Sequence, residues 1–171
     1  MIEAGVGGAS STCARGGVVR RTLSAVRVLF LDIDGVLNRT GFEPNDPVEL
    51  AGWIEPDLAE RLDAALRASA AELVMSSDWR IDRPIALLGE QLARAGVGVG
   101  LRDATPVLNG LPRWREIEAW MVHHRVQPED IVILDDAPTM GPLSWRHVRT
   151  DPRRGLDPVA AAAIGAMFAS S

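Results

Sequence analysis

Short apolar runs recur along the chain and predict the strands of one sheet. Residues 26–31, 73–75 and 131–134 are nearly continuous in hydrophobic side chains, which is typical of strands buried on both faces. Weaker runs at residues 97–99 and 145–148 predict two further strands.

The segments between these runs place apolar residues every three or four positions, which is typical of helices packed on a sheet. Helices are expected to begin at Pro56, near Asp82 and Pro84, at Arg113, and after Asp157, an N-cap followed by Pro158. Strands that alternate with helices predict an α/β protein, a three-layer Rossmann-like parallel sheet with helices on both faces. The inward positions are expected to be Leu58, Leu62, Ala65, Leu66, Ile85, Leu88, Leu92, Ile117, Trp120 and Met121.

Two segments lack either pattern. Residues 1–24 are rich in Gly, Ser, Ala and Arg, and we expect a poorly ordered arm that precedes one domain at 25–171. Residues 38–53 contain two glycines and two prolines and predict a loop. This loop is too short for a folded cap domain, and so is the segment 98–112.

Composition narrows the function without deciding it. The net charge of −5 argues against avid, non-specific binding of nucleic acid. All 18 basic residues are arginines, so any site that needs a cation must use arginine. No apolar run is long enough to span a membrane. The single cysteine, Cys13, cannot form an internal disulfide, and we expect a cytoplasmic protein.

Acidic and hydroxyl side chains follow three of the predicted strands. The first strand ends in Asp32-Ile33-Asp34-Gly35, the second in Ser76-Ser77-Asp78, and a later one in Asp135-Asp136. Ligands of parallel sheets bind at the carboxyl ends of the strands, so these side chains are expected to meet at one edge. Crowded carboxylates call for a counter-cation, and hard oxygen ligands favour Mg²⁺.

The first of these clusters also fits phosphoryl transfer. Asp32 and Asp34 lie two residues apart in an extended chain, roughly 6.5 Å along it, and point the same way. Asp32 would attack phosphorus, while Asp34 would protonate the leaving oxygen and later activate water. An isolated Asp-x-Asp-Gly is usually a turn; its combination with acids at neighbouring strand ends favours a catalytic role.

The run 28–37, VLFLDIDGVL, resembles the first motif of the haloacid dehalogenase (HAD) superfamily. The resemblance implies that Asp32 is a nucleophile that forms an aspartyl-phosphate and that Asp34 is the general acid/base. Ser76 resembles the phosphate-binding hydroxyl of the second motif, with Ser77 as the alternative. The third motif supplies a cation, often lysine; here we expect Arg113, with Arg115 in reserve.

Residues 131–136 resemble the fourth motif of this superfamily, whose acids bind Mg²⁺. The resemblance implies that Asp135 and Asp136 hold the metal together with Asp32 and the backbone carbonyl of Asp34. Residues 76–80 (SSDWR) and 151–156 (DPRRGL) are similar to a small bacterial subfamily without a cap, in which related domains are attached to RNA-repair proteins. An open site is therefore expected.

The expected function is a Mg²⁺-dependent phosphomonoesterase, with a small phosphate ester or a phosphorylated nucleic-acid end as substrate. The main alternative is a non-catalytic or regulatory phosphate-binding domain, against which the presence of both Asp32 and Asp34 argues. A receiver-like phosphorylation switch would need a lysine and a different order of motifs. Dehalogenation would leave Asp34 without a task. Trp53 and Trp79 lie near the expected site, either in packing or in stacking on a substrate. Oligomeric state is left open.

Overall fold

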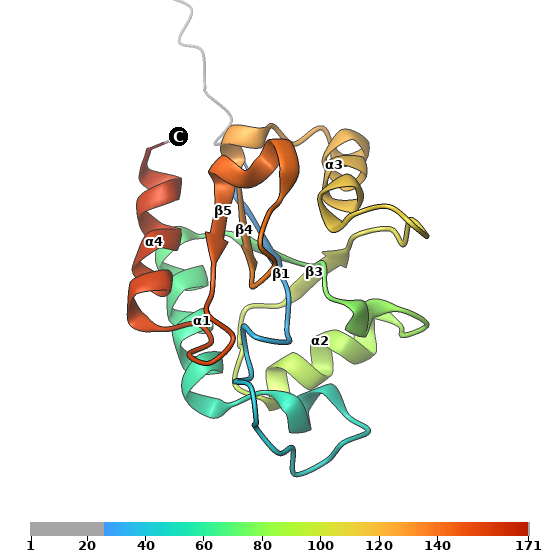
Figure 1. The fold of residues 1–171 in the computed structure, drawn as a ribbon, viewed down its shortest axis with the longest axis vertical. Helices are drawn as coiled ribbons and strands as arrows, with labels where there is room; N and C mark the ends of the chain where they lie inside the picture. Colours follow the sequence, from blue (N-terminus) through green and yellow to red (C-terminus); the bar gives the residue numbers. More distant parts are fainter. Residues whose placement is uncertain (1–25, 171) are drawn as a thin grey trace, which may run out of the picture.

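The computed structural model describes residues 26–170, which form a five-stranded parallel sheet with helices on both faces (Figure 1). The strand order is β3-β2-β1-β4-β5. This confirms the predicted three-layer Rossmann-like architecture; the predicted arm at 1–24 and Cys13 lie outside the described residues. The strands are β1 Val28–Leu31, β2 Glu72–Met75, β3 Leu101–Ala104, β4 Ile131–Asp135 and β5 His147–Arg149.

Each face of the sheet has its own hydrophobic core. Leu29, Leu31 and their neighbours in the other strands pack with helices α1, α2 and α4. Val28 and Phe30 point to the opposite face and pack with α3 and the 3₁₀ segment η4. The alternation of side chains along a strand thus divides the apolar runs between two helical layers. The helices are α1 Pro56–Ser69, α2 Ile85–Arg94, α3 Arg113–His124 and α4 Pro158–Ala169, with 3₁₀ segments η1 Leu50–Trp53, η2 Asp78–Arg80, η3 Pro128–Asp130 and η4 Gly141–Arg146.

Local signals set several helix ends. Pro56 occupies the first turn of α1, where its missing N–H leaves no donor unpaired. The side chain of Asp157 accepts hydrogen bonds from the N–H groups of Val159 and Ala160, at 3.0 and 2.9 Å, and so caps α4 as predicted.

Three details of the sequence-based prediction are wrong. The third strand is β3, not residues 97–99, because the N–H groups of Gly98 and Val99 bond the Asp63 carboxylate instead of a neighbouring strand. Strand β5 begins at His147, and Trp145 lies in η4 with 54% of its surface exposed. Ile85, the first residue of α2, is 39% exposed and does not point into the core.

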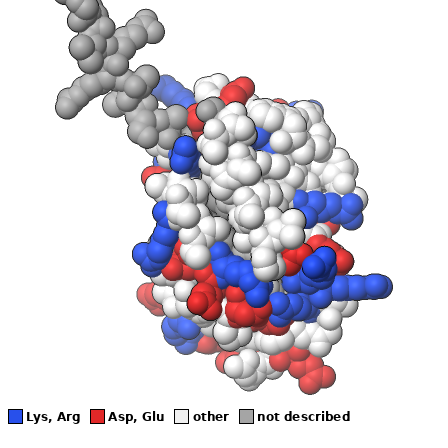
Figure 2. Space-filling model, turned by 90° about the vertical axis from the view of Figure 1, so that its left-hand side faces the viewer, with Lys and Arg blue, Asp and Glu red and all other residues white. Residues whose placement is uncertain are grey.

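The surface around α4 separates uncharged from charged regions. Residues 158–169 contain no charged side chain, and this face is largely white above a belt of mixed acidic and basic residues (Figure 2). The belt carries both signs, so this face offers no continuous basic patch. No helix within residues 26–170 combines the length and the apolar character needed to cross a membrane.

Candidate active site

The sheet register places three polar side chains in one row. Leu31 lies opposite Met75 of β2 and Leu134 of β4, so the next residues, Asp32, Ser76 and Asp135, are neighbours. Backbone hydrogen bonds continue this register past the strand ends. The N–H of Asp32 donates to the carbonyl of Leu134 at 2.9 Å, and the N–H of Ser76 donates to the carbonyl of Leu31 at 2.8 Å. Because side-chain direction alternates, the row faces α3, as Phe30 does.

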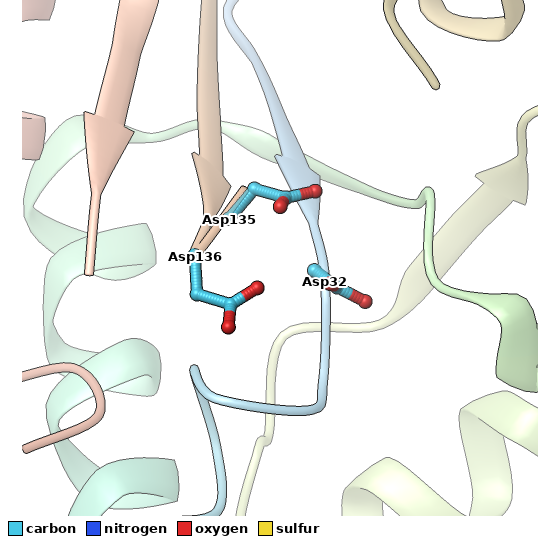
Figure 3. Close-up of side chains that lie close together, drawn as sticks. All are labelled: Asp32, Asp135 and Asp136. Atoms are coloured by element: carbon cyan, nitrogen blue, oxygen red, sulfur yellow. The ribbon is translucent and has the colours of Figure 1, made fainter. Parts of the chain in front are cut away.

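Three carboxylates meet at the carboxyl edge of the sheet. Asp32 follows β1, and Asp135 and Asp136 come from the end of β4 (Figure 3). One oxygen of each lies within 4.8 Å of the others. Asp32 is oriented by the N–H of Ile33, which donates to Oδ1 at 2.8 Å, and Asp135 by the N–H of Ala137, also at 2.8 Å. Asp32, Asp135 and Asp136 thus lie together as expected, and backbone N–H donors orient two of them.

Arg113, the first residue of α3, reaches into this cluster. Its Nη1 lies 2.8 Å from Asp32 Oδ1 and 3.3 Å from Asp135 Oδ2, and its Nη2 lies 3.4 Å from Asp78 Oδ1. The reserve candidate, Arg115, is exposed, pairs with Glu118 and stacks on Trp114. The geometry thus favours Arg113 as the cation of the site.

The cluster perturbs its own acid–base equilibria. Burial, together with the negative charge of Asp32, raises the pKa of Asp135 to about 6. The same two causes, in the same order, raise the pKa of Asp136. Burial lowers the pKa of Arg113, but the carboxylates of Asp32 and Asp135 outweigh it and the net shift is upward. Arg113 stays charged, and its single charge does not compensate all three acids.

Asp34 lies outside the acid cluster, and both of its oxygens are held. The Nδ2 of Asn38 donates to Oδ1 at 2.9 Å, and the indole N–H of Trp79 donates to Oδ2 at 3.1 Å. The Asn38 side chain also accepts a hydrogen bond from the N–H of Gly35 at 3.0 Å, which closes the turn after β1. Both Asn38 and this role of Trp79 were missed in the sequence. The prediction that the Asp34 backbone carbonyl binds metal stays a prediction.

Gly35 makes room for the close approach of Asp136. Its φ is +73°, and a Cβ at this position would lie 2.5 Å from Asp136 Oδ2. The hydroxyl of Thr150, which follows β5, donates to the Gly35 carbonyl at 2.9 Å and anchors the turn. A larger residue at this position would force the Asp136 carboxylate or the turn to shift.

The two serines after β2 differ in environment. Ser76 is fully buried, and its hydroxyl has no hydrogen-bond partner among the described residues. The Ser77 hydroxyl accepts a weak hydrogen bond from the backbone N–H of Trp79 at 3.4 Å, and Ser77 lines the pocket described below. The unsatisfied Ser76 hydroxyl, next to Asp32 in the row, fits a site that gains a polar partner when a ligand binds.

Arg80 braces the edge of the sheet instead of lining the pocket. Its guanidinium donates to the carbonyls of Ser76, Ser77, Thr105 and Pro106 and pairs with Glu116 at 2.5 Å. Only 2% of its side chain is exposed. These bonds tie the segment after β2 to β3 and α3.

A pocket of about 460 Å³ opens above the carboxylates. Its floor contains the two acids of the first motif, Asp32 and Asp34, and the loop 39–53 forms another wall. Within residues 26–170 no folded cap lies above it. The open site expected from the sequence is thus present. The lining residues are Asp32, Asp34, Gly35, Asn38, Arg39, Thr40, Gly41, Phe42, Trp53, Ser77, Asp78, Arg113, Asp136 and Pro152.

The donors at this edge fit a divalent cation. They are carboxylate oxygens in a partly buried cluster, where burial and then the charge of Asp32 raise the pKa of Asp135. Oxygen donors of this kind suit hard ions. Asp32, Asp135 and Asp136 are the side chains that could hold such an ion.

Comparison with known proteins assigns this arrangement to a family. No curated protein matches the sequence. A solved crystal structure is 20% identical, with a TM-score of 0.44, over 85% of this chain and 81% of that chain. The family model described as the HAD domain in Swiss Army Knife RNA repair proteins matches residues 28–161. Because this match spans most of the chain and includes both motifs that supply the acid cluster, the protein belongs to that family of HAD domains.

Proposed function

We propose that the protein is a Mg²⁺-dependent phosphomonoesterase that works through an aspartyl-phosphate on Asp32. The observation that carries the proposal is the grouping of Asp32 with Asp135, Asp136 and Arg113 at the base of an open pocket. Membership of a HAD family supports a phosphatase-type hydrolase. A phosphorylated compound is accordingly the expected partner.

In the first step, a carboxylate oxygen of Asp32 attacks phosphorus. The Asp32 O–P bond forms while the P–O bond to the leaving oxygen breaks, and Asp34 as general acid donates a proton to that oxygen, which departs as an alcohol. The hydrogen bonds from Asn38 and Trp79 hold the Asp34 carboxyl in one orientation beside the pocket, which supports this role. Arg113 and the Ser76 or Ser77 hydroxyl hold the phosphate oxygens.

In the second step, Asp34 takes a proton from a water molecule as the water oxygen attacks phosphorus. The Asp32 O–P bond breaks, which releases phosphate and regenerates the Asp32 carboxylate. Mg²⁺ bound by Asp32, Asp135 and Asp136 would supply charge neutralisation for the phosphate oxygens.

The test replaces the nucleophile without changing its size. Asp32→Asn should abolish Mg²⁺-dependent hydrolysis across a panel of phosphorylated metabolites, nucleotides and 3′- and 5′-phosphorylated oligonucleotides, while thermal unfolding shows an intact fold. Asp130→Asn is the matched control and should retain activity, because Asp130 lies in η3 at the amino end of β4, whereas the site lies at the carboxyl end. Chelation of the metal should abolish wild-type turnover.

Covalent catalysis needs a separate readout. Rapid acid quenching of wild-type protein during turnover should give a phosphorylated peptide that contains Asp32 by mass spectrometry. Hydrolysis by Asp32→Asn at the wild-type rate would refute the proposal, as would phosphorylation at another residue.

A further inference from the structure

Part of the pocket wall is aromatic, and the proposed chemistry does not use it. Phe42 and Trp53 line the pocket, and both belong to the loop 39–53 that stands beside the catalytic floor. Each is partly exposed. The chain has only eight aromatic residues of the Phe, Trp and Tyr types, so two in one polar pocket call for an explanation.

The two tryptophans near the site have different tasks. Trp79 holds Asp34 through its indole N–H, its ring is covered by the guanidinium of Arg83 at 4.5 Å, and it does not line the pocket. Trp53 does line the pocket. Its indole N–H donates to the Pro47 carbonyl at 3.2 Å, and its ring lies 6.2 Å from that of Trp79, tilted by 54°. Packing therefore explains Trp79, whereas Trp53 is a hydrogen-bonded ring that remains partly exposed in the pocket wall.

The charges of the pocket restrict what can stand next to the phosphate. Its lining contains two cations, Arg39 and Arg113. Arg39 is paired with Glu55 and Asp57, and Arg113, which contacts Asp32, is assigned to the phosphate that lies there. No uncommitted cation among the lining residues remains to neutralise a second phosphate close to the first.

The lack of a free cation favours an uncharged group beside the phosphate, and the rings of Phe42 and Trp53 favour a planar one. A pocket of about 460 Å³ has room for such a group beside a phosphate. Stacking on an aromatic ring suits every nucleobase, because each base has a π-face.

We infer that Phe42 and Trp53 form a stacking subsite for a nucleobase, so that the preferred substrate is a phosphate monoester carried on a nucleoside. The inference rests on the proposed function, since the phosphate must lie at Asp32. The nucleoside is either free, as a mononucleotide, or the terminal residue of an oligonucleotide. Base stacking on one aromatic side chain corresponds to about 10-fold to 100-fold in affinity.

The test compares kcat/KM with Mg²⁺ for 3′- and 5′-nucleoside monophosphates, 3′- and 5′-phosphorylated oligonucleotides, nucleoside diphosphates and ribose 5-phosphate. Wild-type protein should prefer the nucleoside-borne monoesters to ribose 5-phosphate by about 10-fold to 100-fold, and nucleoside diphosphates should be poor substrates. Activity on mononucleotides would identify a free nucleotide as the substrate, and activity on oligonucleotide ends would identify a terminal residue. Either result supports the subsite.

Variants of Trp53 separate stacking from packing. Trp53→Ala should bring the ratio of nucleotide to ribose 5-phosphate kcat/KM close to one, and Trp53→Phe should keep most of it. Trp145→Ala removes an exposed indole from η4, which precedes β5 and does not line the pocket, and should leave the ratio unchanged. Equal loss on both substrates in Trp53→Ala would assign Trp53 to packing and overturn the inference, as would a wild-type ratio of one.

A binding measurement separates this inference from the proposed function. If the wild-type protein hydrolyses none of these compounds, the proposed function fails, and calorimetric titration of adenosine monophosphate with Mg²⁺ then decides the subsite. About 10-fold weaker binding by Trp53→Ala, restored in Trp53→Phe, supports stacking. Binding that is absent from wild-type protein, or identical in all three proteins, overturns it.

Discussion

Replacing Asp135 with asparagine should stabilise the metal-free protein at neutral and alkaline pH. Asp135 is 1% exposed, and its pKa is raised to about 6 by burial and by Asp32. The folded protein therefore binds a proton here more tightly than the unfolded chain, whose carboxyl has the ordinary value of 3.8. Stability from this group is present below pH 3.8 and is lost as the pH rises through about 6.

The size of the effect follows from the two pKa values. Their difference of about two pH units corresponds to about 3 kcal/mol between the acidic and alkaline limits, at 1.36 kcal/mol per unit. Between about pH 5 and about pH 8 the same titration lowers the free energy of unfolding by about 1.4 kcal/mol. Asparagine has nearly the same shape and no negative charge, so the variant lacks this dependence.

The assay is urea unfolding of both proteins in chelator, at several pH values from about 5 to 8. Subtraction of the two curves removes most contributions of other groups, and the advantage of Asp135→Asn should grow by about 1.4 kcal/mol across the range. Glu90→Gln, which neutralises an exposed acid on α2, is the control and should give a flat difference. Added Mg²⁺ should stabilise wild-type protein most at high pH and the variant much less.

A difference that is independent of pH, or that shrinks as pH rises, would refute this account of the acid cluster. It would mean that Asp135 is ionised in the folded protein without penalty. Equal stabilisation of both proteins by Mg²⁺ would remove Asp135 from the metal site.

Two further substitutions test the scaffold of the site. Gly35→Ala should lower the free energy of unfolding by about 2–4 kcal/mol and weaken Mg²⁺ binding in a calorimetric titration, because the new Cβ crowds Asp136. The control is Gly110→Ala, where φ is a similar +78° but the space around the Cβ is open, so the free energy of unfolding should fall by only about 1–2 kcal/mol. Equal losses in the two variants would contradict the crowding of Asp136. Arg80→Met should lose about 3–5 kcal/mol in urea unfolding, because it leaves the Glu116 carboxylate buried without its partner. Adding Glu116→Leu to Arg80→Met should recover part of that loss, and strict additivity of the two substitutions would argue against the pair.

The parts of the site that lie on buried strands were predictable from the sequence. Strands β1, β2 and β4 are buried on both faces, so each is a continuous apolar run, and the polar residue that ends it is easily seen. The edge strand β3 was misplaced because its residues, LRDA, are only partly buried and include two charges. Edge strands need no apolar run, since one side meets solvent.

Helix periodicity could have decided between the two candidate arginines. Arg113 lies four residues before the buried Ile117 and therefore shares its face of α3. Arg115 is two residues further, roughly 200° around the helix, and points away from the sheet.

The contact of Asp34 with Trp79 could not have been predicted in this way. Its bond to Trp79 joins positions 45 apart in the sequence and depends on how η2 packs against the first turn. The Asn38 contact is local, and an Asn that follows Asp-Gly at a turn is a signal that could have been used.

The alignment of Asp32, Ser76 and Asp135 in one row has a consequence for how this protein can change. Adding or deleting one residue within β1, β2 or β4 would turn the terminal side chain to the opposite layer, so the lengths of these strands cannot vary. The loop 39–53 lies between β1 and α1, outside these strands, and its length does not affect their register. New substrate preferences can therefore arise by insertion in that loop, and exchanging it between related domains offers a practical route to phosphatases with altered selectivity.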